Sequence, residues 1–347
     1  MADYNSGGGS STPDKTKDSL ALLVQDHFSL AKEYRAGSGD EETWREAYDA
    51  HRAIHPTKVN GVLSLAKKRG VFVHLVRRRV NSARVKITSL LFESGKVPFS
   101  ITPNYNPKFA APDLQEIPPE QVNDEVDMRA ERMENTIRDI LRKTDYISVI
   151  NDTVLEMCLY GTGVTKSIVL KGYNYPVYKS ARQDPEMLKA EDLLESELIP
   201  TVERVSIWDL FPNPEAKSIE DCDWVIQRGN YSKQQLIALK EQPGFDENAI
   251  DEILEVDTSE DYGHDQSESP SKSGQISRER TKKYQILEEW GTYTKDDLVP
   301  YTSVKKFKGD SIPMCITVCG DKVIRVVENP FDGRIPYDLC YWERNPE

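Results

Sequence analysis

The feature that most constrains the fold of this chain is a change of hydrophobic periodicity at the glycines Gly161 and Gly163. Before them, apolar residues recur at spacings of three and four, which is typical of amphipathic helices that bury one face. After them, apolar and polar residues alternate in short runs between turn residues, as in half-buried strands. We therefore expect an α+β fold, with a helix-rich N-terminal half followed by a mixed β domain.

The first half carries five helical patterns and one short alternating run. The helices are expected over 18–35, 41–54, 71–93, 119–144 and 145–159. Gly95 follows the third pattern and is expected to end it. The run VPFSITPN (97–104) alternates and predicts a short strand, and the proline-rich residues 112–121 predict a loop.

The second half predicts strands interrupted by short helices. The strands are expected within 164–170, 173–180, 200–211, 221–232, 283–294 and 316–328, and the helices at about 184–196, 232–241 and 246–256. Residues 257–280 contain almost no apolar side chains and predict a long mobile surface loop. Residues 1–17 lack the apolar core of a signal peptide and predict a flexible arm.

Charge and cysteine content exclude several classes of protein. The formal net charge is −13, with 30% charged residues. Such a chain repels nucleic acid on average, which argues against a sequence-specific DNA-binding module but not against an acidic wall past which DNA slides. No run of about 18 apolar residues is present, so we expect no membrane span. Five scattered cysteines indicate reduced thiols in a cytosolic environment.

No catalytic, cofactor or metal motif survives inspection. The turn YGTGVTKS resembles a phosphate loop, but Thr165 stands where that motif has glycine, and the turn is expected to join a helix to a strand, the reverse of a P-loop. Cys315 and Cys319 share a strand face without a second ligand pair, which favours buried packing. The histidines form no HExxH motif and no compact triad. We expect no enzyme, although folding could still assemble a two-metal carboxylate site.

A basic run stands out in this acidic chain: Lys67, Lys68, Arg69, Arg77, Arg78, Arg79, Arg84 and Lys86. Four of these residues are candidates for contacts to DNA phosphates: Arg77, Arg78, Arg84 and Lys86. The alternative is an exposed helix face that pairs with acidic neighbours in the same or an adjacent subunit, for which the acidic stretch 246–268 offers counter-charge. The alternative is favoured, because three consecutive arginines point in three directions around a helix.

Several short passages follow one another along the chain in an order that carries information. They are Leu90-Leu91-Phe92 with Val97-Pro98-Phe99-Ser100-Ile101-Thr102-Pro103, then Tyr160-Gly161-Thr162-Gly163-Val164-Thr165-Lys166, then Val205-Ser206-Ile207-Trp208-Asp209-Leu210-Phe211-Pro212-Asn213-Pro214, then Glu288-Glu289-Trp290, and finally Asn329-Pro330-Phe331 with Ile335-Pro336-Tyr337. Together they resemble the portal proteins (head-to-tail connectors) of tailed double-stranded DNA bacteriophages, podovirus-like portals in particular. The resemblance spans roughly residues 60 to 347, with Ile207-Trp208 and Asn213 as departures from the family's "V.P.DLFPDP" turn.

The resemblance implies a structural role. It implies a homo-oligomeric ring, usually a dodecamer, at one capsid vertex, through which DNA is packaged and ejected. The partners would be double-stranded DNA, the terminase large subunit, the major capsid and scaffolding proteins and the tail adaptor, in the virion and, during assembly, in the host cytoplasm. It implies a flexible arm (1–17), a helical wing region (18–163) and a β-rich wing/hub region (164–347). Such portals continue into a stem, clip and barrel, which we expect to be missing here.

Two other functions stay open. One is a different virion structural protein, such as a head–tail adaptor or an injected internal protein. Adaptors are usually much shorter, and injected proteins lack this β-rich second half. The other is a packaging-associated ATPase or nuclease, which the absence of a P-loop disfavours.

Overall fold

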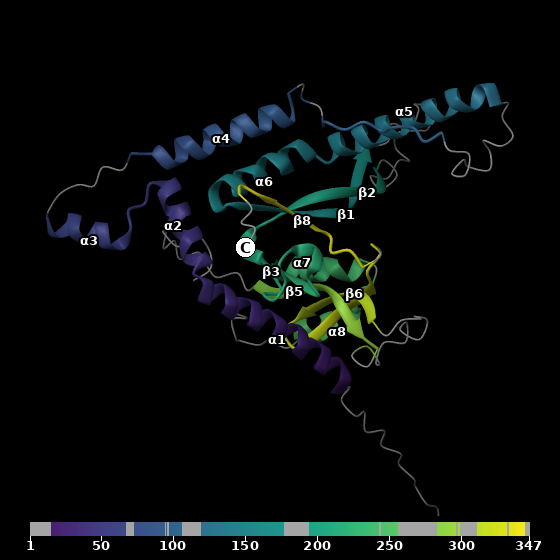
Figure 1. Ribbon diagram of the computed structural model, residues 1–347. Helices are drawn as coiled ribbons and strands as arrows, with labels where there is room; N and C mark the ends of the chain where they lie inside the picture. Colours follow the sequence, from purple (N-terminus) through teal and green to yellow (C-terminus); the bar gives the residue numbers. More distant parts are fainter. Residues whose placement is uncertain are drawn as a thin grey trace, which may run out of the picture. The chain divides into compact units, whose positions relative to one another are not determined.

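The computed structural model describes residues 15–66, 73–93, 95, 97–105, 119–176, 194–242, 244–255, 283–295, 298, 311–331 and 333–343. The fold is α+β, as predicted, with helices concentrated in the first half and two antiparallel sheets in the second (Figure 1). Residue contacts divide the chain into two compact units, which interleave along the sequence. Unit 1 comprises Met1–Asp49 and Ser206–Ile335, and unit 2 comprises Ala50–Val205 and Pro336–Glu347.

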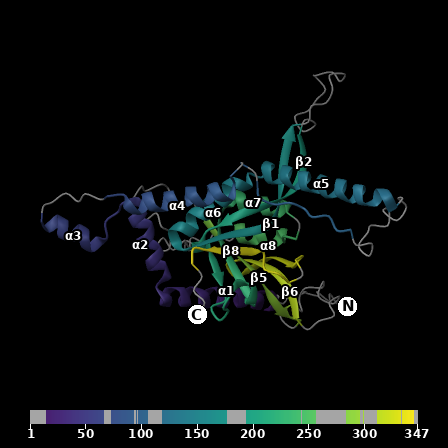
Figure 2. The same ribbon diagram turned by 45° about the horizontal axis from the view of Figure 1, so that its top comes forward.

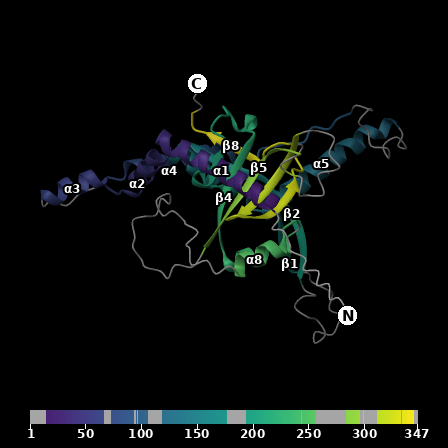
Figure 3. The ribbon, with the colours of Figure 1, turned by 90° about the horizontal axis from the view of Figure 1, so that it is seen from below.

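Unit 1 is built on a five-stranded antiparallel sheet in the order β3-β4-β5-β6-β7. Its strands are β3 (Leu210–Pro212), β4 (Trp224–Ser232), β5 (Lys283–Thr294), β6 (Ser311–Cys319) and β7 (Lys322–Glu328). Helix α1 (Lys15–Ser38) contacts β3 and β7, and Figure 3 shows it lying across the strands. Helices α7 (Lys233–Ala238) and α8 (Glu247–Glu255) contact β4, β5 and β7.

Both faces of this sheet are buried. On one face, Leu20, Ala21 and Val24 of α1 pack against a core that includes Phe211 and Ile316. The second core is formed by Leu236, Leu239, Ile250, Tyr284, Ile286, Cys319 and Ile324. A strand covered on both sides needs apolar residues at successive positions, which explains why β6 is nearly continuously apolar. Short 3₁₀ turns, η5 (Ile207–Asp209), η6 (Ile219–Asp221) and η7 (Leu239–Glu241), complete the unit.

Unit 2 contains a three-stranded antiparallel sheet in the order β2-β1-β8. The strands are β1 (Thr162–Pro176), β2 (Leu194–Val205) and β8 (Tyr337–Tyr341). The helices are α3 (Thr57–Leu65), α4 (Leu75–Leu91), α5 (Pro119–Lys143) and α6 (Tyr146–Tyr160). Helix α6 contacts all three strands, and α4 and α5 contact α6 (Figure 2). Helix α2 (Asp40–Arg52) carries the chain across the boundary between the units.

The junction between α6 and β1 depends on two glycines. Gly161 caps α6 with a φ of 86°, a left-handed conformation that favours glycine, and its N–H donates to the Met157 carbonyl at 2.9 Å. At Gly163 a Cβ atom would lie only 2.5 Å from the Thr153 carbonyl oxygen. This glycine therefore lets β1 lie directly against α6, and the turn joins a helix to a strand as predicted.

Most sequence-predicted elements are confirmed within a few residues. The five helices of the first half correspond to α1, α2, α4, α5 and α6, and those at 232–241 and 246–256 to α7 with η7 and to α8. Helix α3 was not predicted. The helix expected at 184–196 falls mostly outside the described residues, and its last residues, 194–196, instead begin β2. Residues 1–14 of the predicted arm and the predicted loop 257–280 also lie outside the described residues, whereas the last residues of the arm, 15–17, begin α1.

The strand expected at 97–104 is wrong. This segment forms no ladder; its backbone is bonded by side chains of α5 instead. Arg138 donates to the carbonyls of Val97 (3.4 Å) and Phe99 (2.8 Å), and the N–H of Ile101 donates to the Glu134 carboxylate at 3.1 Å. Since these groups are already satisfied by α5, the alternating sequence needs no partner strand.

Candidate assembly and nucleic-acid surface

The four basic candidates lie on α4, but in different surroundings. Arg84 faces α6: its Nε donates to Asn151 Oδ1 at 2.8 Å, and its guanidinium lies 3.5 Å from the Asp152 carboxylate. It therefore ties α4 to α6 and is poorly placed to meet a ligand. Arg77, Arg78 and Lys86 are exposed. That these residues contact DNA stays a prediction.

The two sides of α4 differ in chemistry. Val80, buried, and Ile87, half-buried, lie on the side that includes Arg84. At 100° per residue, Arg78 and Val85 fall about 20° apart on the opposite side. Lys86 follows Val85, and Leu75 and Leu90 flank this side, with 60% and 81% of their surface exposed. The outer side of α4 therefore combines positive charge with uncovered apolar side chains.

Arg77 lies near the end of α2, where it affects His51. Burial lowers the pKa of His51, and the positive charges of Arg77 and Arg52 lower it further. His51 and His55 are four residues apart in the sequence, but α2 ends at Arg52, so the two histidines do not share a helical face.

The N-terminal half of α5 bears the opposite charge. Asp124, Asp127 and Glu131 lie at spacings of three and four around Met128, and all four side chains are exposed. The Tyr105 hydroxyl donates to the Asp127 carboxylate at 2.5 Å. This hydrogen bond, together with burial and the charge of Asp127, raises the pKa of Tyr105. Figures 1 and 2 show that this half of α5 extends away from α6.

The passage 205–214 is held by two buried arginines. Arg35 of α1 donates to the carbonyls of Trp208 and Leu210, and its guanidinium lies 3.7 Å from the centre of the Phe211 ring. Arg228 of β4 donates to Asp209 Oδ1 at 3.0 Å and to the Trp208 carbonyl at 3.0 Å. These contacts fix the turn and its aromatic side chains, and they do not present a reactive group.

The residues of the Glu288-Glu289-Trp290 motif are also structural. Glu289 is fully buried, and His27 Nδ1 of α1 lies 2.9 Å from its carboxylate. The His27 ring stacks on Trp224 with centroids 4.5 Å apart. Trp290 donates to Glu288 and packs on Phe331. The motif thus fastens α1 to the sheet.

The last motif forms an Asx-type turn. The Asn329 side chain accepts from the N–H of Phe331 and donates to the carbonyl of Arg334, both at 2.9 Å. Beyond it, Tyr337 begins β8 and pairs with Lys166 of β1. The Pro336 carbonyl accepts from the N–H of Ser167 at 2.9 Å. The two motifs that contain Lys166 and Tyr337 therefore meet in unit 2, which sequence alone could not show.

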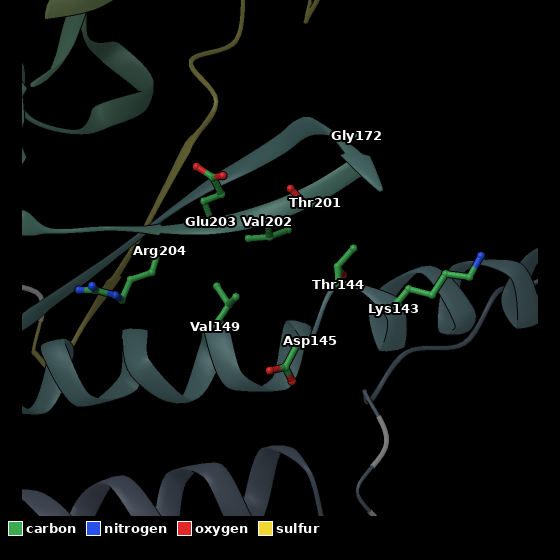
Figure 4. A pocket seen from close by; sticks show the side chains of 9 residues that line it. All are labelled: Lys143, Thr144, Asp145, Val149, Gly172, Thr201, Val202, Glu203 and Arg204. Carbon is green, nitrogen blue, oxygen red and sulfur yellow. The ribbon is translucent and has the colours of Figure 1, made fainter. Parts of the chain in front are cut away.

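One pocket lies between the α5–α6 junction and the β1–β2 hairpin (Figure 4). Its lining residues are Lys143, Thr144, Asp145, Val149, Gly172, Thr201, Val202, Glu203 and Arg204. Charges of both signs line it, and its lining residues include no serine, cysteine or histidine. Arg204 is already paired with Glu156 of α6. The pocket carries no catalytic assignment.

Burial raises the pKa of four of the five thiols, those of Cys158, Cys222, Cys319 and Cys340. Cys315 and Cys319 are buried, as predicted, and all five cysteines are free. Burial, with the nearby charge of Asp321, raises the pKa of Cys319 to about 12, and burial is likewise the main cause that raises the pKa of Cys222 to about 11. Thiolates are the metal-binding and nucleophilic form, so these thiols are suited to packing.

The described residues contain no group of three or more histidine, cysteine, aspartate or glutamate side chains placed to hold a metal ion. None of the helices in the described ranges is long and apolar enough to cross a membrane.

Comparison with known proteins gives one family. Residues 176–347 match the model of the phage SU10 portal protein family. No curated protein sequence matches the chain significantly. The matched range contains three of the short passages, at 205–214, 288–290 and 329–337, whereas those between residues 90 and 166 precede it. The match supports the identification of this chain as a phage portal protein, the head-to-tail connector of a bacteriophage virion.

Proposed function

We propose that this chain is a subunit of the portal ring at one capsid vertex, the conduit through which double-stranded DNA enters the head during packaging and leaves during ejection. This proposal rests mainly on the family match over residues 176–347. The portal family implies a homo-oligomeric ring within the capsid. The number of subunits, which we propose to be twelve, and the roles in packaging and ejection go beyond that match.

Exposed apolar side chains support assembly. Val62 and Leu65 of α3 expose 65% and 87% of their surface, and Leu90 of α4 exposes 81%. Val62 and Leu65 lie three residues apart on α3 and so share one exposed face, which is typical of a surface that a partner covers. We propose that 18–163 forms the helical wing region and 164–347 the β-rich wing/hub region of that subunit.

The proposed partners follow from this role. They are the terminase large subunit and the tail adaptor, which dock on the ring, and the major capsid and scaffolding proteins around it, with assembly in the host cytoplasm. The portal family is structural, and we assign no catalytic residue. The net charge of −13 suits a passage in which DNA moves without adhering.

Mass photometry and electron microscopy of the purified protein test the ring. We expect closed rings with rotational symmetry at micromolar concentration. A chain that stays monomeric at every concentration up to that of the crowded host cell would overturn the proposal. A phage that lacks this gene should form empty heads, and complementation with the gene should restore filled heads. That result would link the ring to packaging.

A further inference from the structure

Two exposed faces of unit 2 carry opposite charge and have no cover within the described residues. We propose that in the ring the basic outer side of α4 of one subunit packs against the acidic N-terminal half of α5 of the next copy. This inference rests on the proposed ring. It names the contact that joins neighbouring subunits, which neither the family match nor the sequence motifs assign.

The α4 face is defined by Arg78, Arg79, Val85, Lys86 and Leu90. The three cationic side chains are exposed and make no ion pair among the residues that the structure describes. On the same face, Val85 exposes 63% of its surface and Leu90 exposes 81%. Five exposed positions within four turns thus present both charge and apolar area, while Val80 and Arg84 on the other side hold α4 to α6.

The α5 face is defined by Asp124, Asp127, Met128 and Glu131. Asp124 and Glu131 have no cationic partner in the described ranges, and Met128 exposes 44% of its surface. Methionine adapts its shape to a partner, so an acidic rim around methionine suits a basic rim around valine and leucine.

The other acidic helix is a weaker partner. In α8, Asp251 already contacts Lys240, and Glu252 lies 2.9 Å from Lys322. These carboxylates are neutralised inside their own unit. The acidic stretch 246–268, which sequence alone offers as counter-charge, is therefore less available than α5 within its described part.

A second copy explains both faces together. DNA would pair with the α4 cations but would leave Val85 and Leu90 uncovered and the α5 carboxylates unmatched. A contact between two different faces of identical subunits is heterologous, and such a contact gives a ring where the rotation between neighbouring subunits closes. Complementary charge would fix the order and register of neighbouring subunits.

Charge reversal tests this contact. The variant R78E/K86E and the variant D124K/E131K should each weaken subunit association roughly tenfold, because each places like charges across the contact. Mixed in equal amounts, the two variants should assemble again, because every contact in an alternating ring regains opposite charges. A variant with all four substitutions should also assemble. Mass photometry gives the ring fraction, and native mass spectrometry shows whether the two variants alternate.

The control variant K217E/K233E makes the same charge change as R78E/K86E at two exposed lysines of unit 1. It should assemble as the wild type does. Circular dichroism and thermal melting of each variant establish that its subunits are folded. If R78E/K86E or D124K/E131K fails to fold, the variant with all four substitutions and the neutral variant R78Q/K86Q provide the same comparison.

The outcomes separate the two proposals. If the wild type forms no ring, the proposed function and this contact both fail. If the wild type forms rings and both reversal variants form them equally well, the contact is wrong and the ring stands. If R78E/K86E assembles normally but its rings lose affinity for duplex DNA, the α4 face serves DNA, and the contact is overturned.

Discussion

Among single residues, Arg35 joins two parts of unit 1 that lie far apart in the sequence. It is buried, and it links α1 to the passage 205–214 through the carbonyls of Trp208 and Leu210 and through the Phe211 ring. A planar guanidinium can donate to two carbonyls while lying over an aromatic ring, and no other side chain does both.

We expect Arg35→Met to lower the free energy of unfolding by about 2–4 kcal/mol, because it removes the Arg35 donors to the Trp208 and Leu210 carbonyls and leaves the Trp208 carbonyl to Arg228 alone. Urea denaturation followed by tryptophan fluorescence measures it. The control Arg142→Met removes an arginine whose side chain is 81% exposed, and it should change stability by less than about 0.5 kcal/mol. Equal midpoints for the two variants would contradict this role of Arg35.

At Gly163 the constraint is space. A Cβ atom there would lie 2.5 Å from the Thr153 carbonyl oxygen and 2.8 Å from its methyl carbon, so α6 and β1 would have to separate. We expect Gly163→Ala to cost about 1–3 kcal/mol. Gly172 is the matched control, since it lies in the same strand and a Cβ there would meet nothing within 4 Å. Thermal melting of both variants should show a loss at position 163 only.

Between elements, the link of segment 97–105 to α5 is sensitive to pH. The pKa of Glu134 is held below its ordinary value of 4.5, first by the Arg138 side chain and then by the N–H of Ile101. The folded state therefore releases this proton more readily than the unfolded chain. The stabilisation is present above the unfolded pKa and is lost as the pH falls through the folded value.

Glu134→Gln should remove this pH dependence. Hydrogen exchange of the Ile101 amide should be slower in the wild type than in Glu134→Gln at pH 6, and the two rates should converge as the pH falls well below 4.5. Asp139→Asn on the same helix is the control, because the Asp139 carboxylate is 66% exposed and pairs with an exposed arginine three residues on. A constant difference between wild type and Glu134→Gln across this pH range would refute the assignment.

The elements whose own sequence shows a clear helical or alternating pattern could be predicted. Helices α1, α5 and α6 repeat their apolar residues at helical spacing, and β5 and the β6–β7 hairpin alternate between turns. Helix α3 escaped prediction because it is nine residues long and contains Gly61.

What depended on distant partners was not predictable. The run 97–104 alternates as a strand does, but Arg138 and Glu134 of α5, more than 30 residues away, satisfy its backbone. In the same way, the sequence grouped Arg84 with Arg78 and Lys86 as one basic cluster. The hydrogen bond from Arg84 to Asn151 of α6 shows that Arg84 is an internal contact, whereas Arg78 and Lys86 are exposed.

For the whole molecule, the proposed contact between α4 and α5 makes ring assembly depend on salt. Exposed charges more than about 8–10 Å apart are screened at 0.10–0.15 M salt, and close pairs between exposed side chains also weaken as salt rises. The apolar part of the contact, from Val85, Leu90 and Met128, is not weakened by screening. Rings should therefore loosen as sodium chloride rises from 0.05 to about 0.5 M, without dissociating completely.

The neutral variant R78Q/K86Q separates this contact from other charge effects. The net charge of −13 makes whole subunits repel one another, and salt relieves that repulsion. Losing two positive charges makes the repulsion slightly stronger, so in this variant added salt should favour assembly or leave it unchanged. Mass photometry across the salt series would show opposite slopes for the wild type and R78Q/K86Q. Parallel slopes would mean that other charges, not Arg78 and Lys86, govern how the subunits meet.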